Sequence, residues 1–173
     1  MPVGKEQFSM GRTSGLLRVA FFTGCVGSLV FGPVNEATVR VLARNGCEVV
    51  VPHQQACCGA LHVHAGEPEI ARAMARRNIA AFESSGAEVI IANAAGCGAM
   101  LKEYAALLCH DPSYAGRAAH FSALDRDVSE FLASIPLCTT FGPLPRRATY
   151  QDACHLAHVQ KVRQQPRSLL RAI

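Results

Sequence analysis

The sequence predicts an α/β domain with a mostly parallel sheet, flanking helices, and cysteines at the carboxyl-terminal edge of the strands. Short apolar runs alternate with longer segments of helical periodicity, which is typical of successive β-α-β units. Half of the 173 residues are hydrophobic and 17% are charged, as in folded globular proteins. A cysteine follows each apolar run within a few residues.

The first half of the chain predicts two strands and the helix between them. Leu17–Thr23 is a short apolar run that ends at a glycine, which indicates a buried strand. Pro33 opens a helical pattern that stops at Asn45–Gly46. Glu48–Pro52 is β-branched and bounded by proline, and predicts the second strand. We expect a short helix after the next loop.

The second half repeats this alternation, with a proline-containing linker before the last strand. In chain order we expect a helix over 68–85, a strand over 88–92, a helix to about residue 108, helical structure over 114–133, a linker over 137–147, a strand over 148–151 and a helix opening near residue 166.

Charge and hydropathy argue against nucleic-acid binding and against a membrane-spanning segment. The net charge of +4 is modest, the basic residues are scattered and the chain has no Trp, so we expect no nucleic-acid partner. The most apolar stretch, Val19–Val34, is broken by glycines and a proline and is too short to span a bilayer. The N-terminus lacks the apolar core of a signal peptide. We expect a cytoplasmic protein, with peripheral association at the inner membrane left open.

Five of the eight cysteines follow predicted strands. Because parallel strands end at one edge of a sheet, these five are expected to converge there. They are Cys25, Cys57, Cys58, Cys97 and Cys154. The other three, Cys47, Cys109 and Cys138, fall at the far ends of helices or in the linker and are expected to be structural or incidental.

The surroundings of the five cysteines suit thiolate ligands. Each precedes a predicted helix, whose free N–H groups and dipole are expected to lower a thiol pKa. Glycines beside them allow the backbone to approach a bulky cluster, and we expect four to form the pocket backbone: Gly24, Gly59, Gly96 and Gly98. The first four thiolates match the ligand count of a [4Fe–4S] cluster.

Two other kinds of chemistry fit the same residues. His62 and His64 come after the cysteine pair and are able to complete a structural zinc site with some of the cysteines. Their simpler interpretation is hydrogen bonding around the loop. The adjacent Cys57 and Cys58 also suit direct thiol–disulfide chemistry.

The motifs TGCVG, QQACCGALHVHAG and NAAGCGAMLKEY resemble the cysteine-rich CCG domain of the heterodisulfide reductase family, above all its glycolate oxidase iron–sulfur subunits. The resemblance runs from about Arg18 to the C-terminus. It implies a cytoplasmic electron-transfer subunit that holds a [4Fe–4S] cluster through Cys25, Cys57, Cys58 and Cys97. Such a subunit passes electrons from a flavin-containing dehydrogenase subunit, which oxidises glycolate or another 2-hydroxy acid, and has no catalytic residue of its own.

The chain departs from the family pattern in two ways. Met100 stands where the family has a further cysteine, which leaves four thiol ligands and the cluster geometry unassigned. The ferredoxin-like region and a second Cys-Cys-Gly are missing, so the sequence resembles a subunit truncated at both ends.

The resemblance also implies a division of the chain. FFTGCVG and TYQDACHLAH are similar to each other, so Cys154 is a candidate ligand of a second site. We expect a flexible leader over 1–15, the first CCG domain over 16–136, the linker over 137–147, and the start of an incomplete second repeat over 148–173.

Overall fold

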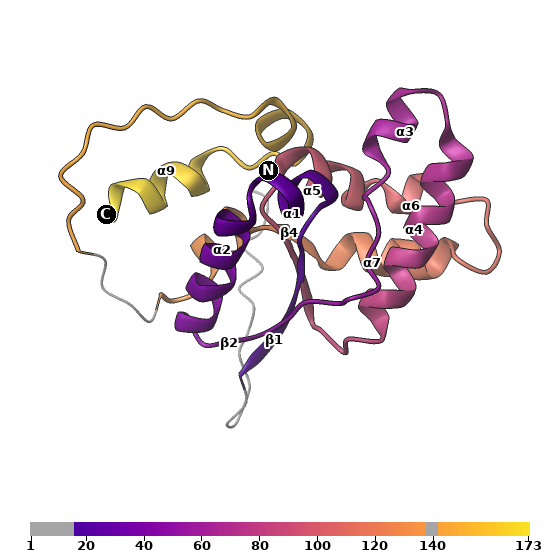
Figure 1. Cartoon of the computed structure of the whole chain (residues 1–173), viewed down its shortest axis with the longest axis horizontal. Helices are drawn as coiled ribbons and strands as arrows, with labels where there is room; N and C mark the ends of the chain where they lie inside the picture. Colours follow the sequence, from indigo (N-terminus) through magenta and orange to yellow (C-terminus); the bar gives the residue numbers. More distant parts are fainter. Residues whose placement is uncertain (1–15, 138–141) are drawn as a thin grey trace, which may run out of the picture.

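In the computed structural model the protein has three layers, a parallel sheet between two layers of helices (Figure 1). The structure describes residues 16–137 and 142–173. The expected α/β class with a parallel sheet is confirmed. The sheet has the order β2-β1-β3-β4, and its strands are β1 (Leu17–Phe22), β2 (Cys47–Val50), β3 (Val89–Ala92) and β4 (Asp125–Asp127).

The interior position of β1 explains its uninterrupted apolar sequence, because both of its faces are covered. Phe21 lies in the apolar cluster that contains Leu42. Phe22 lies in the opposite cluster, where its ring centroid is 5.9 Å from that of Phe82.

Helices α2, α8 and α9 lie on one face of the sheet, and α4 to α7 lie on the other (Figure 1). The helices of the described residues are α1 (Cys25–Val30), α2 (Gly32–Arg44), α3 (Ala60–His64), α4 (Pro68–Glu83), α5 (Ala95–Lys102), α6 (Tyr104–Leu107), α7 (Ala115–Leu124), α8 (Val128–Ser134) and α9 (Gln164–Arg171), with a π-helical turn, η1 (His155–Val159). None of them is long and apolar enough to cross a membrane.

The prediction of the fourth strand was wrong. Residues 148–151 form no strand, and the fourth strand is Asp125–Asp127, inside the segment 114–133 that was expected to be helical, in one or two pieces. Asp125–Asp127 is polar, but it pairs with Ile90–Ala92 of β3, and that ladder outweighs its low β propensity. The stretch before Tyr150 is exposed, with no neighbouring strand in the described sheet. The expected leader and Cys138 lie outside the described residues.

Asn78 and Tyr104 anchor the irregular loop after β2. Asn78, fully buried on α4, accepts a hydrogen bond from the backbone N–H of Ala56 (2.6 Å) and donates to the carbonyl of Cys57 (3.1 Å). It also donates to the hydroxyl of Tyr104 (2.9 Å). That hydroxyl in turn donates to the carbonyl of Cys58 (2.8 Å). The two side chains therefore replace the backbone partners that this loop lacks.

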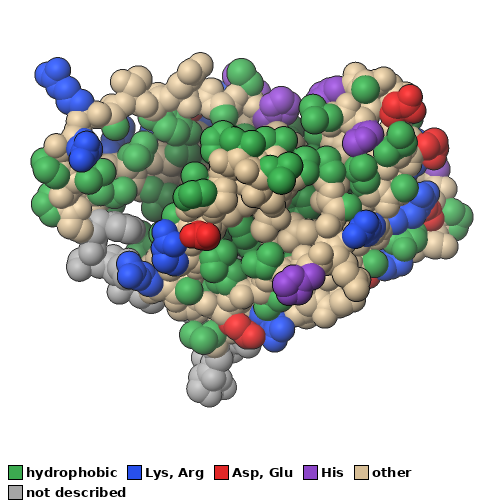
Figure 2. Space-filling model, in the orientation of Figure 1, with side chains coloured by type: hydrophobic (Ala, Val, Ile, Leu, Met, Phe, Trp, Pro, Cys, Tyr) green, Lys and Arg blue, Asp and Glu red, His purple; other side chains and the backbone are tan. Residues whose placement is uncertain are grey.

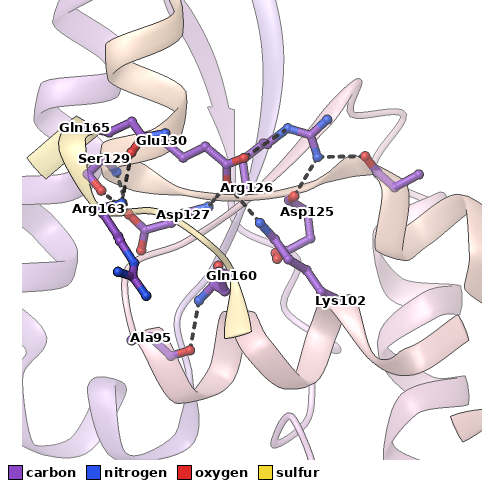
Figure 3. A network of polar contacts seen from close by, with 11 residues as sticks. Ala95, Lys102, Asp125, Arg126, Asp127, Ser129, Glu130, Gln160, Arg163 and Gln165 are labelled. Atoms are coloured by element: carbon purple, nitrogen blue, oxygen red, sulfur yellow. Dashed lines mark hydrogen bonds and ion pairs between the residues drawn. The ribbon is translucent and has the colours of Figure 1, made fainter. Parts of the chain in front are cut away.

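Asp125 is a buried acid behind α5. Its exposed fraction is 0%, and neither carboxylate oxygen has a hydrogen-bond partner among the described residues. Lys102, the nearest basic group along α5, donates instead to Glu130 (2.9 Å; Figure 3). Burial raises the pKa of Asp125 well above its usual range; the positive charge of Lys102 opposes this shift and the negative charge of Glu130 adds to it.

The Asn78 anchor predicts a stability effect. Asn78→Ala is expected to lower the free energy of unfolding of the apoprotein by about 2–4 kcal/mol, because it leaves buried loop groups without partners. Tyr104→Phe, which removes one hydroxyl, is expected to cost about 1–2 kcal/mol. Urea unfolding measures both. The control is Ser84→Ala at the exposed end of α4, where a change within about 0.5 kcal/mol is expected. If all three variants unfold at the same urea concentration, Asn78 and Tyr104 do not anchor the loop.

Asp125 predicts a pH dependence. Its raised folded-state pKa means that the folded chain keeps a proton that the unfolded chain loses above about pH 4. Stability therefore falls as pH rises from that point towards the raised pKa, by up to about 1.4 kcal/mol per pH unit. Asp125→Asn is expected to remove this loss of stability. The free energy of unfolding of the variant therefore rises relative to that of the wild type as pH rises.

The opposite change of stability with pH is expected for Asp152, because hydrogen bonds from Arg167 lower its pKa. Asp152 stabilises the fold above its unfolded pKa, and this contribution disappears as pH falls. Asp152→Asn is therefore the matched control in urea titrations between about pH 4 and pH 8. Parallel stability curves for wild type and Asp125→Asn contradict the assignment.

Candidate metal centre

The candidate site lies at the carboxyl edge of β1 and β3. The chain leaves β1 towards β2 through α2, and returns to β3, on the other side of β1, through α4 on the opposite face. Ligands in open α/β sheets bind at such a reversal of strand order. Cys25 begins α1 directly after β1, and Cys97 lies in the first turn of α5 after β3.

The structure brings four of the expected cysteines together. The Sγ atoms of Cys25 and Cys57 are 3.4 Å apart. Cys58 donates a hydrogen bond to Cys97 and also interacts with Cys57. The thiols thus form a series that joins the loops after three strands. Their common position results from parallel strands ending at one edge, as expected from the sequence.

Amide side chains hold these loops in register. Gln55, in the loop after β2, accepts hydrogen bonds from the backbone N–H of Thr23 (3.0 Å) and from its hydroxyl (3.2 Å). Asn35 donates to the carbonyl of Thr23 (3.0 Å) and accepts from Asn93, which comes directly after β3 (2.9 Å). The ends of β1, β2 and β3 are therefore linked beneath the cysteines.

Two of the four expected pocket glycines, Gly24 and Gly59, have a backbone conformation that favours glycine, and a third, Gly98, lies against a side chain. Gly24 has a φ of 69°, and a Cβ there would lie 3.5 Å from the Sγ of Cys97. Gly59 is left-handed (φ 90°), with its missing Cβ 3.1 Å from Ala71. A Cβ on Gly98 would lie 2.9 Å from a side-chain atom of Gln160. Gly96 faces open space, and its role in the pocket stays a prediction.

The thiols have different proton affinities. Burial, and then the neighbouring Cys57, raises the pKa of Cys25. Donation to Cys97, and then burial, raises the pKa of Cys58. Accepting that hydrogen bond lowers the pKa of Cys97. The expectation that helix N-termini lower the thiol pKa values was therefore wrong for Cys25 and Cys58, where burial and thiol–thiol contacts outweigh the backbone.

Exposed apolar side chains are frequent at the rim of the site. Helix α1 has no buried residue, and Leu29 is 87% exposed. Phe31 after α1 and Leu61 on α3 are also exposed. Figure 2 shows apolar side chains gathered over α1, with the charged side chains away from it. An apolar surface of this kind next to an exposed thiol is typical of an interaction site.

In the described part of the chain, no hydrogen bond joins the other candidate ligands to this series. Cys154 is exposed at the residue before η1, and its role in a second site stays a prediction. His64 is exposed, with its ring centroid 6.5 Å from that of His155. His62 has a buried Nδ1 without a hydrogen-bond partner in the described part of the chain, so hydrogen bonding around the loop does not account for that atom. Cys47 is buried at the start of β2, on the opposite edge of the sheet.

The donor set fits an iron–sulfur cluster. Four cysteine thiols are the usual ligands of such clusters, and the glycine at position 24 keeps the space beside Cys97 free of a side chain. In residues 16–137 and 142–173 no three or more His, Cys, Asp or Glu side chains are grouped as for a single metal ion.

Two residues that support the site, Asn78 and Gln160, were not expected from the sequence. Asn78 carried a signal, because it shares the helical face of Ala71, Ala75 and Phe82, where a polar residue needs a buried partner. Nothing in the sequence marked Gln160, because the residue that it contacts, Ala95, is remote in sequence.

Comparison with known proteins agrees with this site. Residues 19–102 match the family model CCG, "Cysteine-rich domain". The chain is 45% identical over 158 residues to the "Probable glycolate oxidase iron-sulfur subunit" of Bacillus subtilis, covering 90% of this chain and 36% of that protein. It is 36% identical over 148 residues to the "Glycolate oxidase iron-sulfur subunit" of Escherichia coli, covering 84% and 36%. It is 32% identical over 153 residues to "Lactate utilization protein A" of an Exiguobacterium strain, covering 88% and 62%.

No solved structure matches the chain. The chain spans about a third of the length of the two glycolate oxidase relatives and less than two thirds of the lactate utilization protein. The matched segment contains Cys25, the Cys57–Cys58 pair and Cys97, the same thiols that the fold brings together. Residues 19–102 of the chain therefore form a CCG cysteine-rich domain.

Proposed function

We propose that this chain is the iron–sulfur part of a glycolate or related 2-hydroxy-acid dehydrogenase complex, in which it transfers electrons from a flavin-containing subunit to an acceptor. One observation carries the proposal: the thiols of Cys25, Cys57, Cys58 and Cys97 lie in contact at the edge of the sheet where ligands bind. The names of the relatives support an iron–sulfur protein.

Cys25, Cys57, Cys58 and Cys97 would hold a [4Fe–4S] cluster, which supplies one-electron uptake and release when bound. The chain's own residues shape the environment of that cluster. Cys58 is 4% exposed, so this side of the site excludes water. Cys25 is exposed and opens the site towards α1. Cluster binding requires all four thiols to lose their protons, so uptake is favoured as pH rises.

The apolar rim is the proposed contact surface for the flavin-containing subunit. Two relatives are named as subunits, which supports a complex with other chains. The exposed Leu29 and Phe31 lie next to the exposed Cys25, so a partner that covers them also comes close to the cluster. We place this complex in the cytoplasm, at the inner membrane only through a partner.

The substrate class rests on the names of the relatives. They include glycolate oxidase subunits and lactate utilization proteins, and glycolate and lactate are both 2-hydroxy acids. The proposal therefore extends to this class of acid and not to one member of it.

Anaerobic reconstitution with iron and sulfide tests the cluster directly. We expect a brown protein with about four irons per chain and a broad visible absorption. Cys58→Ser is expected to lose most of the iron, because it removes the central member of the thiol series. Cys109→Ser, at an exposed cysteine outside the site, is expected to load like the wild type. Iron analysis and visible spectra give the readout.

Two outcomes would replace the proposal. One zinc per chain without visible absorption indicates the structural zinc module that His62 or His64 would complete. A metal-free protein in which one of Cys57 and Cys58 is alkylated rapidly near neutral pH indicates thiol–disulfide chemistry of the heterodisulfide reductase type.

A further inference from the structure

A strained segment outside the matched domain packs against the helix that carries Cys97. Residues 155–159 form the π-helical turn η1, a rare conformation that is often found at functional sites. Lys161 has a φ of 61° and is the only non-glycine residue with a positive φ in the part of the chain that the structure describes. Leu156 and Val162 on either side are buried. Strain that persists in a structure must be held by its contacts, and it is often associated with function.

Gln160 makes the contact between this segment and α5. It is only 8% exposed, and its side-chain amide donates to the carbonyl of Ala95, the first residue of α5, at 2.9 Å (Figure 3). The same amide lies against Gly98: a Cβ there would be 2.9 Å from Nε2 and 3.1 Å from Oε1. Gln160 therefore touches α5 on both sides of Cys97 in the sequence.

Cys97 itself contacts the cysteine site. Its thiol accepts a hydrogen bond from Cys58 and lies next to the Cα of Gly24. The first turn of α5 thus contacts both the site and Gln160. The side-chain Oε1 of Gln160 is buried without a hydrogen-bond partner among the described residues. Simple packing does not require such an amide, because an apolar side chain of the same size would avoid the cost of burying its oxygen.

We propose that Gln160 is a positioning residue for Cys97, so that the segment Cys154–Arg163 completes the first cysteine site although it lies outside residues 19–102. This inference rests on the proposed function only for its cluster readouts. The position of Cys97 itself is measurable in the apoprotein.

The experiment compares four variants of the whole chain. Gln160→Ala removes the contact, and Gln160→Met keeps the volume but removes the amide. Gly98→Ala adds a methyl group that meets the side chain of Gln160, and the double variant Gly98→Ala/Gln160→Ala relieves that clash. Gln165→Ala is the matched control, since that glutamine lies in the same C-terminal region and accepts from Arg163 within it.

In the apoprotein, alkylation of each cysteine at one pH is monitored by mass spectrometry, with the exposed Cys109 as internal reference. Gln160→Ala and Gln160→Met are expected to raise the rate at Cys97 at least about threefold, because the first turn of α5 opens more often. Gln165→Ala is expected to leave it unchanged. Gly98→Ala is expected to have a larger effect alone than in the Gln160→Ala background.

In the reconstituted protein, the Gln160 variants are expected to lose iron faster to a chelator, with a changed electron paramagnetic resonance line shape and midpoint potential. If the wild type takes up no iron, the proposed function fails, and the alkylation rates still decide the role of Gln160. Cys97 rates equal to those of Gln165→Ala overturn the inference. Equal acceleration at Cys57, Cys58 and Cys97 also overturns it, because it indicates a general loosening of the fold.

Discussion

The hydrogen bonds from Asn78 and Tyr104 to the loop after β2 are the interactions on which the site depends most. The carbonyls of Cys57 and Cys58 are buried beside the core and belong to no helix or strand, so side chains must satisfy them. Both anchors are fully buried in the apolar cluster between the sheet and α4 to α7. The cysteine pair is therefore held by the same core that stabilises the domain.

The environment of the site differs sharply between its two sides. Towards solvent, α1 and α3 present exposed apolar side chains near the exposed Cys25. Behind α5, the buried Asp125 lies near the half-buried ion pair of Lys102 and Glu130 (Figure 3). The hydrogen bond from Cys58 lowers the pKa of Cys97, and burial and the neighbouring thiols of Cys25 and Cys57 oppose this shift. The same fold thus offers an exposed apolar face for a partner and a polar cluster behind α5.

The C-terminal segment contributes to the domain that precedes it. Its sequence around Cys154 resembles the start of the chain's own first motif, which favours a second repeat. In the structure, η1 packs on α5, and α9 packs on α8. The division between a first domain and a second repeat remains a prediction, but the two parts are in close contact at Gln160.

The sequence alone determined which elements form and where the chemistry gathers. The apolar runs ending before Cys25, Cys57 and Cys97 specified three parallel strands, and parallel strands bring the loops at their carboxyl ends to one edge of the sheet. Only the tertiary structure decided the rest, because it depends on partners remote in sequence. Asp125–Asp127 is a strand because β3 lies beside it, and the fourth strand expected at 148–151 had no such neighbour. The individual thiol pKa values depend on burial and on which thiol donates to which, and neither is encoded in local sequence.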